Sequence, residues 1–493
     1  MKRFSSAILL ALVSSSLLFG GGLVTNTNQS AAWARTLTRQ ASWGTDAVYY
    51  NPAGLGLMNK GIHLSLSNQF IFQTQKITNN YTFIDGAPVT YEGSVRAFLF
   101  PGVYAVYKMD KLAISAGFNV IGGGGGADFK EGLPSFEIPV ASLVPILQGS
   151  LAPIDQAIEG LTGNNPGFAN VTGYNLSAPF NGTSMYLGVQ AGATYAINDI
   201  VSVALGARYV TAKNTYEGSL TGVTVDAPAA YGGTQAPGTY VRFVGNQINP
   251  LDPATGALLF ATADALDAQT ADKQVEAVQT GWGITPIAGV NIHLYDVVNI
   301  GLKYEHHTKI ELENETTVDN VGMFPDGAIT RADLPGMFSL GIQLNPINKL
   351  TASLGYNMYL DKPAFYGVTD AGGIQINNET TIDNNSYELG LSLEYMLMNS
   401  FGLSAGFLMA RNGVNDTYQS DLNYALNTNS VAGGFYLGIG DRIGINAGVV
   451  YVMFQEYSVG KTYTFTGAPA PVPFTETYNK NTILFAIGLD FKF

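Results

Sequence analysis

The sequence predicts an all-β protein: a 14-stranded antiparallel transmembrane β-barrel with an N-terminal hatch (plug) and helical segments in long extracellular loops. Three observations predict this fold class. Segments of about ten residues alternate apolar with polar side chains, as from Leu350 to Leu360 and from Tyr387 to Leu397. Along the chain, very short turns alternate with long polar connections. The last residue, Phe493, ends an alternating apolar stretch, which is typical of the signal that the barrel-assembly machinery reads.

Composition agrees with a barrel and restricts the function. Only 12% of the 493 residues are charged, and we expect no stretch after Arg35 to reach the ~20 apolar residues of a spanning helix. The net charge of −13 is spread along the chain without a basic patch, so we expect no nucleic-acid partner. Cysteine is absent, which excludes disulfides, thiolate metal sites and a lipid anchor on an N-terminal cysteine. We expect neither a metal nor a cofactor.

Residues 1–34 have the pattern of a secretory signal peptide. Lys2 and Arg3 form its charged start, and an apolar segment runs from Ala7 to Phe19. Ala32-Trp33-Ala34 has the small-x-small pattern of a cleavage site. The alternative is an N-terminal membrane anchor, which a short apolar segment interrupted by serines disfavours.

The alternation predicts fourteen strands. They span residues 61–74, 94–108, 111–121, 183–197, 200–215, 282–295, 297–311, 336–345, 349–361, 385–398, 400–411, 429–440, 442–456 and 481–493. Short turns are expected at residues 109–111, 198–199, 295–296, 345–349, 398–400 and 440–442. An even number of strands puts both chain ends on the periplasmic side. A soluble β-protein is the alternative, but one strand face is rich in Leu, Ile, Phe and Tyr while the other carries Gly, Ser and Asn, which suits a lipid face and a lumen.

Two long loops interrupt the alternation, near residues 122–182 and 216–281. The first contains apolar residues at helical spacing, although Pro145 and Pro153 are expected to kink or split the helix. A second helical stretch is expected from Ala257 to Val278. The apolar face of the first loop is a candidate ligand groove or packs on its own neighbours, and the sequence leaves both open. The groove residues are Leu143, Leu147, Leu151, Ile154 and Ile158.

The segment from Asp46 to Leu55, with the sequence DAVYYNPAGL, is the sharpest local motif. Asn51-Pro52 favours a turn, and Gly54 after Ala53 permits a tight one. A compact, turn-rich segment just before the first strand predicts a hatch inside the barrel, over residues 35–60, with the barrel over residues 61–493. The alternative is a plain loop that leads into the first strand.

This segment resembles the N-terminal hatch of the FadL/TodX family of outer-membrane transporters of hydrophobic compounds. The resemblance implies a fourteen-stranded barrel, an extracellular groove, an internal pocket and a lateral exit at a kinked strand. Carried over, Asp46, Asn51, Pro52, Ala53 and Gly54 are hatch residues. Gly122, Gly123 and Gly124, at the end of the third expected strand, are the candidate kink, with a flexible loop start as the alternative. Members of this family differ in substrate, so the motif indicates the family more than the ligand.

Inward charges are few, and most are expected to form salt bridges with one another. Arg208 and Lys303 are candidate contacts for a carboxylate head group, because a charge-assisted bond suits that chemistry. His63 and Ser65 resemble the His-x-Ser pair of outer-membrane phospholipases. Both are expected to face inward, however, whereas the phospholipase site lies on the outer wall. We therefore expect no catalytic residues and no enzyme activity.

These observations predict passive uptake of hydrophobic compounds, long-chain fatty acids first, across the outer membrane of a Gram-negative bacterium. The expected partners are fatty acids or aromatic hydrocarbons, outer-membrane lipid and, during biogenesis, the barrel-assembly machinery. A monomer is expected. The alternatives are a barrel that serves protein secretion or assembly, and a general porin.

Overall fold

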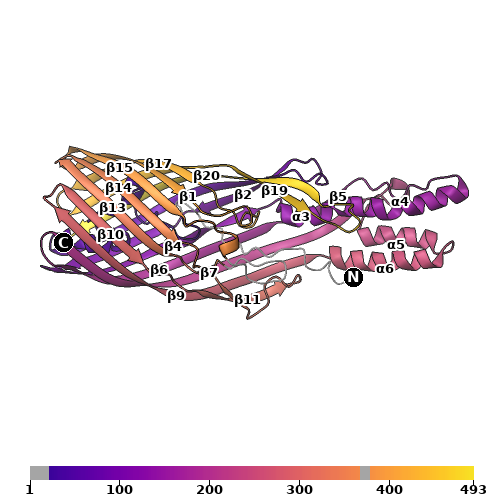
Figure 1. Cartoon of the computed structure of the whole chain (residues 1–493), viewed down its shortest axis with the longest axis horizontal. Coiled ribbons are helices and arrows are strands. Elements are labelled where there is room, and N and C mark those ends of the chain that lie inside the picture. The colour runs from indigo at the N-terminus through magenta and orange to yellow at the C-terminus, as the bar shows by residue number, and fades with distance from the viewer. Residues whose placement is uncertain (1–21, 367–377) are drawn as a thin grey trace.

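The computed structural model describes residues 22–366 and 378–493, and its strands close into one antiparallel barrel (Figure 1). Fourteen strand positions form the ring. In order they are β1 (Gly61–Asn79), β3 (Pro101–Lys108), β4 (Leu112–Phe129), β6 (Phe180–Ala196), β7 (Val201–Asp226), β9 (Lys273–Leu294), β10 (Val298–Glu305), β13 (Gly336–Ile347), β14 (Leu350–Leu360), β15 (Tyr387–Met398), β16 (Phe401–Arg411), β17 (Thr428–Ile439), β18 (Ile443–Phe454) and β20 (Val472–Lys492). β20 pairs with β1 from Glu476 to Lys492 and closes the ring. The predicted fold class is confirmed.

All six expected short turns lie at one end of the barrel, together with the C-terminus. We call this the turn end and the opposite end the loop end (Figure 1). The turn between β9 and β10 places Tyr295 and Asp296 at φ 51° and 55°. Two consecutive residues with positive φ form the hairpin turn whose twist matches the twist of paired strands. The alternation and the turns together set the register of the sheet.

The outer face near the turn end is an apolar belt. Large side chains point away from the lumen there and stay exposed, for example Leu205 (72%), Leu393 (57%) and Ile487 (51%). Toward the loop end the outward residues become polar, as at Lys76 and Lys213. A continuous exposed apolar surface of this kind is stable against lipid tails rather than water.

Most strands on the β1–β9 side are longer than the alternation predicted. β7 continues to Asp226, beyond the expected end at residue 215, and β9 begins at Lys273 instead of residue 282. The reason is that these extensions lie beyond the apolar belt, where outward residues such as Glu217 are polar and apolar residues such as Tyr216 and Val225 are buried instead. The pattern of the belt, with its apolar side chains facing outward, therefore does not continue. Two expected strands are also divided. Residues 94–108 form β2 (Val89–Ala97) and β3, and residues 297–311 form β10 and the start of β11 (Glu311–Asp319).

The long loops carry helices at the loop end. The first contains α3 (Pro134–Ala141) and α4 (Leu143–Thr162), and the second contains α5 (Pro237–Ile248) and α6 (Pro253–Thr270). The expected helix from Ala257 to Val278 was therefore misplaced, because its last residues belong to β9. The division of the first helix falls at Ser142, and α4 continues through Pro153. Pro145 lies in the first turn of α4, where its missing N–H costs no hydrogen bond.

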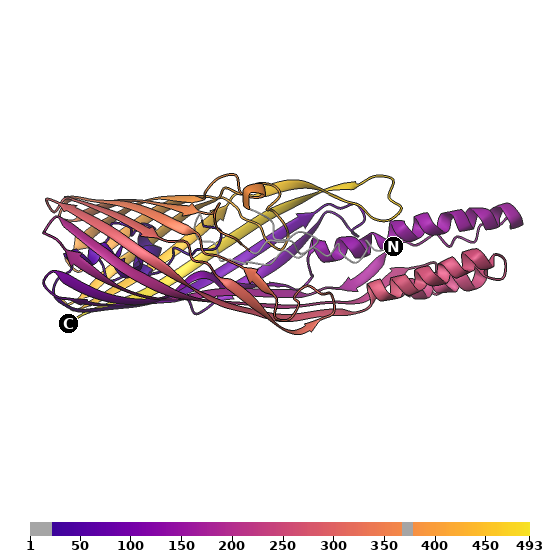
Figure 2. The same cartoon turned by 60° about the horizontal axis from the view of Figure 1, so that its bottom comes forward.

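The four helices share an apolar core that is separate from the core of the barrel. Leu147 of α4, Tyr240 and Val244 of α5 and Leu259 of α6 are buried in it. Figure 2 shows α4 and the α5–α6 pair as two arms that extend beyond the strands. Together, α3 and α4 are long and apolar enough to cross a bilayer by length and composition, with mean hydropathy 1.3. This corrects the expectation that no such stretch follows Arg35, and the loop-end core accounts for the apolar residues.

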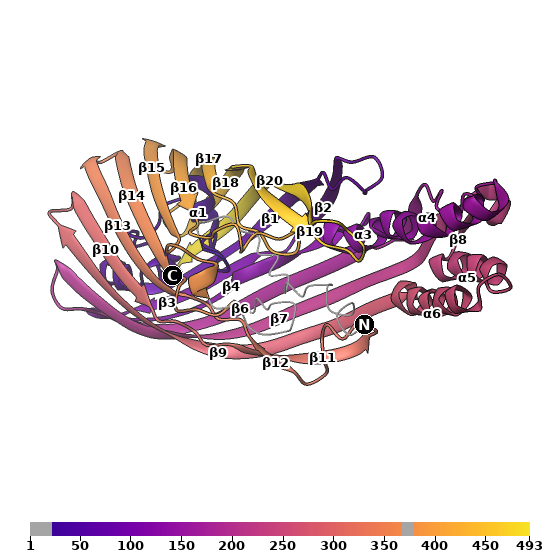
Figure 3. The ribbon, with the colours of Figure 1, turned by 45° about the vertical axis from the view of Figure 1, so that its right-hand side comes forward.

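The smaller elements complete the description. They are α1 (Ala31–Thr36), α2 (Ala47–Tyr50), η1 (Pro52–Leu57), β5 (Tyr174–Ser177), η2 (Ala229–Tyr231), β8 (Thr234–Gln235), β12 (Ile329–Arg331), η3 (Asn378–Thr380) and β19 (Tyr457–Tyr463). Of these, α1, α2 and η1 lie inside the barrel. Figure 3 shows α1 enclosed by the strands at the turn-end half of the molecule.

Candidate functional site: the hatch and the gap in the barrel wall

The lumen is filled by the N-terminal segment, residues 23–58, which we call the hatch. Leu23 to Leu55 are almost entirely buried. Ser30 begins α1, because its hydroxyl accepts a hydrogen bond from the Trp33 N–H at 3.0 Å. Leu37 ends α1 in the left-handed region, at φ 62°. The buried segment therefore extends upstream of residue 35, the expected start of the hatch, and the bounds of the hatch as a domain stay a prediction. The charged start and the whole apolar segment of the expected signal peptide lie outside the described residues, and its cleavage site stays a prediction.

Hydrogen bonds tie the hatch to strands on all sides of the barrel. Five side chains of the wall donate hydrogen bonds to backbone carbonyls of the hatch. The donor and acceptor pairs are Tyr104 and Gln29 (2.8 Å), Thr194 and Pro52 (2.7 Å), Ser202 and Ala53 (2.6 Å), Asn299 and Ala41 (2.6 Å), and Lys303 and Tyr49 (3.0 Å). In the other direction, Arg35 donates to Asn446 on β18 at 2.8 Å and forms an ion pair with Glu394 on β15. A segment held from many directions closes the lumen as a plug.

The Asn-Pro-Ala-Gly motif joins the hatch to the wall. Asn51 has two roles: its side-chain oxygen accepts from the Ala53 N–H at 3.3 Å, and its Nδ2 donates to the Val290 carbonyl on β9 at 3.1 Å. Pro52 occupies the first turn of η1. The predicted hatch residue Asp46 lies deeper in the lumen, where it accepts from Ser30 and pairs with Arg39, each at 2.7 Å.

Arg208 and Lys303 meet at a buried carboxylate. Arg208 donates to both oxygens of Glu305, at 2.7 and 2.9 Å, and Lys303 donates to it at 2.7 Å. Both cations also lie 4.8 Å from the centre of the Tyr49 ring of the hatch. This geometry favours the salt-bridge alternative. Contact of Arg208 and Lys303 with a ligand head group stays a prediction.

The predicted kink of the third strand coincides with an irregular stretch of β4. The register of β4 against β6 shifts between Val120 and Gly122 and again between Gly123 and Gly125. Gly123 has φ 60°, and a Cβ there would lie 2.3 Å from the Ser184 carbonyl oxygen, so only glycine fits. Gly122 and Gly124 flank it.

The other edge of β4 has no strand partner over the same stretch. β4 pairs with β3 up to Asn119 and with β2 only at Asp128 and Phe129. Opposite lies the break between β2 and β3, residues 98–100. Within the described residues, no strand pairs with this edge of β4 over residues 120–127, and we call this break in the ladder the wall gap.

The start of the hatch covers the wall gap from the lumen. Thr25 forms an antiparallel bridge with Gly122, and the Asn26 N–H donates to the Ile121 carbonyl at 2.8 Å. The side chains of Asn26 and Gln29 donate to the carbonyls of Gly123 and Val120, at 2.8 and 2.9 Å. The unpaired edge of β4 is thus satisfied by the hatch instead of by another strand.

The apolar face predicted on the first loop packs inside the protein. Leu143, Leu147 and Leu151 are buried in the loop-end core, and Ile154 and Ile158 are partly buried against it. Packing against neighbouring elements is therefore what the structure describes. A ligand groove at these residues stays a prediction.

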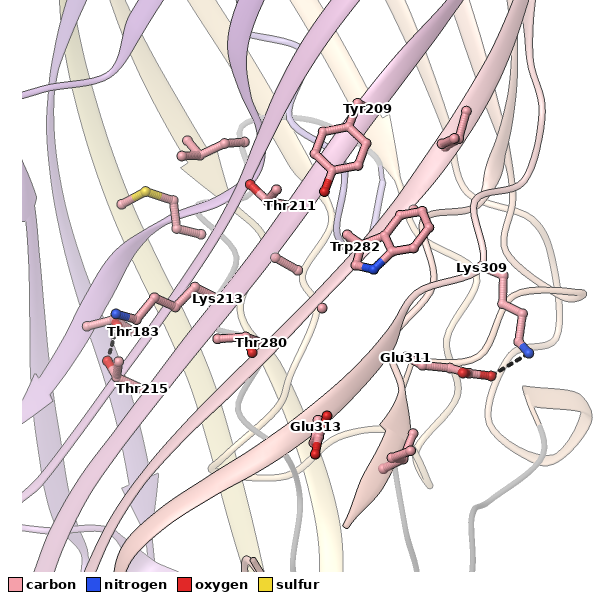
Figure 4. A pocket seen from close by; sticks show the side chains of 17 residues that line it. Thr183, Tyr209, Thr211, Lys213, Thr215, Thr280, Trp282, Lys309, Glu311 and Glu313 are labelled. Atoms are coloured by element: carbon pink, nitrogen blue, oxygen red, sulfur yellow. Dashed lines mark hydrogen bonds and ion pairs between the residues drawn. The ribbon is translucent and has the colours of Figure 1, made fainter. Parts of the chain in front are cut away.

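A large cavity lies on the outer wall and not in the lumen. It has a volume of about 1120 Å³ and is lined by outward-facing residues of β6, β7 and β9 and by the β11–β12 hairpin (Figure 4). Tyr209 and Trp282 lie across from each other in it, with ring centres 5.8 Å apart. It lies at the border of the apolar belt, so its position suits contact with lipid head groups and does not place it on a path through the hatch.

Sequence reasoning missed two parts of this site. Thr25 to Gln29 were assigned to the signal peptide, although the cluster of amide side chains just after the apolar segment is a signal that they fold with the protein. Glu305 is the second part: the alternation of its strand puts it on the inward face, but this pattern does not identify its partners. The partners come from strands far apart in the chain.

Comparisons with known proteins agree with this architecture. No family model matches the chain, and no curated protein matches it. The structure of a Pseudomonas aeruginosa FadL homologue matches 96% of this chain and 100% of its own, with TM-score 0.60 and 11% identity. The toluene transporter TodX of P. putida matches 91% of this chain and 94% of its own, with TM-score 0.53 and 14% identity. The toluene transporter TbuX of Ralstonia pickettii matches 95% of this chain and 99% of its own, with TM-score 0.52 and 15% identity. This chain has the fold of the FadL homologue and of the TodX and TbuX transporters.

Proposed function

We propose that this protein takes up hydrophobic compounds passively across the outer membrane of a Gram-negative bacterium, with long-chain fatty acids as the first substrate class. Two kinds of observation support the proposal. The structural neighbours include a FadL homologue and two toluene transporters. The barrel has an apolar belt for lipid, a closed lumen and a wall gap beside the exposed apolar side chains of Phe98 and Leu99. Because two neighbours are named for toluene, monoaromatic hydrocarbons are the second substrate class.

The observation that carries the proposal is the hatch segment 25–29 on the wall gap. Release of this segment from β4 opens a lateral path, while the rest of the hatch stays bound to the other strands. For a hydrophobic ligand, transfer from the lumen into the bilayer is more favourable than transfer into water. The concentration gradient then drives uptake.

The alternative functions make different demands. A general porin needs an open, charge-lined lumen, whereas the inward charges Arg208, Lys303 and Glu305 pair with one another beneath the hatch. A secretion or assembly component needs a surface for a soluble protein, and the described residues offer no specific feature for one. The uptake channel is therefore the function that we propose.

The test is uptake by cells that lack their own barrels for hydrophobic compounds. Cells that express this chain are expected to take up oleate, toluene or both faster than cells with an empty vector. In planar bilayers the purified barrel is expected to conduct ions poorly. Absence of uptake for every hydrophobic compound contradicts the proposal and favours an assembly role, and a large steady conductance favours a porin.

A further inference from the structure

Lys480 is a buried lysine on the lumenal face of β20, toward the loop end. It is 7% exposed. The outward neighbours Asn479 and Asn481 are polar, so this part of β20 lies beyond the apolar belt. Among the described residues, no carboxylate lies within salt-bridge distance of Lys480. Lys303 and Lys461, in contrast, pair with Glu305 and Glu476.

The contacts that Lys480 does make are weak. Its Nζ lies 3.4 Å from the Tyr424 carbonyl oxygen, which is long for a hydrogen bond, and 4.1 Å from the centre of the Tyr424 ring. Burial lowers the pKa of Lys480 to about 7. A buried cation without an anion is costly, and such a group is more often kept for binding than for stability.

Tyr424 belongs to a loop that folds into the lumen, residues 412–427, which we call the strap. Tyr418, Leu422 and Leu426 of the strap are buried, although it forms no strand longer than a single bridge. One anchor is the Asp421 carboxylate, which accepts from the Ser135 N–H at the start of α3 at 2.7 Å. A second is the Tyr424 ring, stacked on Tyr478 with centres 4.7 Å apart.

The strap closes a small cavity beside Lys480. Its volume is about 20 Å³, enough for about one water molecule. The wall contributes Ala127, Phe129 and Phe180 together with the buried amide of Gln75, and Leu133 lies beside them at the start of α3. Removal of the strap residues from this site leaves Lys480 as the charged group of a chamber whose other wall residues are mainly apolar. Such a site matches an amphiphile with one anionic head and an apolar tail.

We propose that Lys480 binds the carboxylate of an amphiphilic ligand in the lumen, and that the strap occupies this site until the ligand displaces it. The proposal rests on the proposed function and assigns the residue that holds the substrate's head group and the segment that controls access to it. Without ligand, the strap fills the site, and the Tyr424 carbonyl and ring occupy the position of the ligand carboxylate. A charge-assisted hydrogen bond to a carboxylate is the stronger partner.

The charged and titratable groups around Lys480 favour this assignment. Asp421 and Tyr424 face it from the strap, and Tyr478 lies on β20 beside it. Glu476 is engaged by Lys461, by the Tyr478 hydroxyl and by Asn79, whose Nδ2 donates to it at 3.1 Å. Burial raises the pKa of Asp421 to about 6, so its carboxylate is charged at neutral pH and leaves the site when the strap moves. Burial also raises the pKa of Tyr424 and of Tyr478, so both phenols stay neutral.

The test compares oleate with oleyl alcohol, which has the same tail and no carboxylate, by equilibrium binding to the purified full chain. The native protein is expected to bind oleate more tightly by roughly tenfold to a hundredfold, the range of a charge-assisted bond. Lys480→Met is expected to lower oleate affinity to that of oleyl alcohol and to leave oleyl alcohol binding unchanged. Lys130→Met, at an exposed lysine of the same loop end, is the matched control and is expected to change neither.

The pH profile separates a binding role from a structural one. The pKa of Lys480 in the protein without ligand is about 7, so Lys480 loses its charge as the pH rises from 7 to 9. The affinity for oleate relative to oleyl alcohol is therefore expected to fall over this range. Lys480→Arg, which stays charged, is expected to keep its preference across this range. A preference for oleate that survives Lys480→Met overturns the proposal. If the native protein binds both ligands equally, Lys480 has no such role and hydrophobic uptake stands. If it binds neither, the Lys480 proposal fails, and the uptake assay with toluene decides whether the proposed function stands.

Discussion

Gly54 shows how tightly the hatch folds on itself. A Cβ at this position would lie 2.4 Å from the carbonyl oxygen of Ser42, a backbone atom that cannot rotate away. Gly54→Ala is therefore expected to destabilise the hatch by about 1–3 kcal/mol, the usual cost of overpacking. The measurement is the rate at which a protease cleaves the hatch in the purified barrel.

Gly149 is the matched control, because a Cβ on it meets nothing within 4 Å. Gly149→Ala in α4 is expected to be neutral or slightly stabilising, since alanine favours a helix. Equal protease sensitivity of Gly54→Ala and the native protein would contradict the role of Gly54.

Glu305 is the shared anion of two buried cations. Glu305→Gln leaves Arg208 and Lys303 uncompensated, and loss of one partner of a buried ion pair costs about 3–5 kcal/mol. We expect a lower temperature for the change in electrophoretic mobility that marks barrel unfolding. Glu311→Gln, in the exposed pair with Lys309, is the control and is expected to leave this temperature unchanged. An equal temperature for both variants would show that the buried group adds no stability.

At the scale of elements, the hatch behaves as two parts. Residues 25–29 lie on the wall gap, and the remainder contacts the other strands. The double variant Asn26→Ala, Gln29→Ala removes three side-chain hydrogen bonds to β4, one of them long at 3.4 Å, and each is worth about 1 kcal/mol or less. We expect faster hydrogen exchange at the Asn26 amide and a higher basal rate of uptake.

The control for this pair is Thr78→Ala, which removes an exposed hydroxyl contact between β1 and β2. Exchange that rises uniformly over the whole hatch, instead of at residues 25–29 alone, would contradict the division into two parts.

The processing site is a second question at this scale. Cleavage after Ala34 removes Thr25 to Ser30, whose side chains bond to the barrel wall and to the rest of the hatch. The buried position of Leu23 favours an earlier cleavage. We expect the intact mass of the secreted protein to correspond to a start at or before Leu23. A mass that corresponds to a start at Arg35 would contradict this expectation.

At the scale of the whole molecule, two separate cores predict separable parts. The barrel core and the loop-end core are distinct clusters, and β7 pairs with β9 from Val201 to Leu220 below the helices. Replacement of residues 229–270 by a short turn is therefore expected to leave the barrel folded, as shown by its heat-dependent electrophoretic mobility. Loss of the folded form would show that the helices are needed to assemble the barrel.

Sequence reasoning succeeded where one physical signal dominates. Within the apolar belt, lipid on one side and lumen on the other impose a strict period of two, so β13 to β18 lie close to their expected bounds. Above the belt that constraint vanishes, and the extensions of β7 and β9 were read as loop. The Asn51-Pro52-Ala53-Gly54 turn was recognisable because proline and glycine restrict the backbone locally.

By itself, the sequence determined the barrel, its strand number and its turn end, because each depends on residues close together in the chain. Only the tertiary structure decided which distant groups meet: Asn26 with β4, Arg208 with Glu305, and Lys480 with the strap. These contacts join residues 56 to 97 positions apart, and closure of the ring brings them together. Alternation specifies which face a side chain occupies, but its neighbour across a lumen depends on how the whole barrel closes.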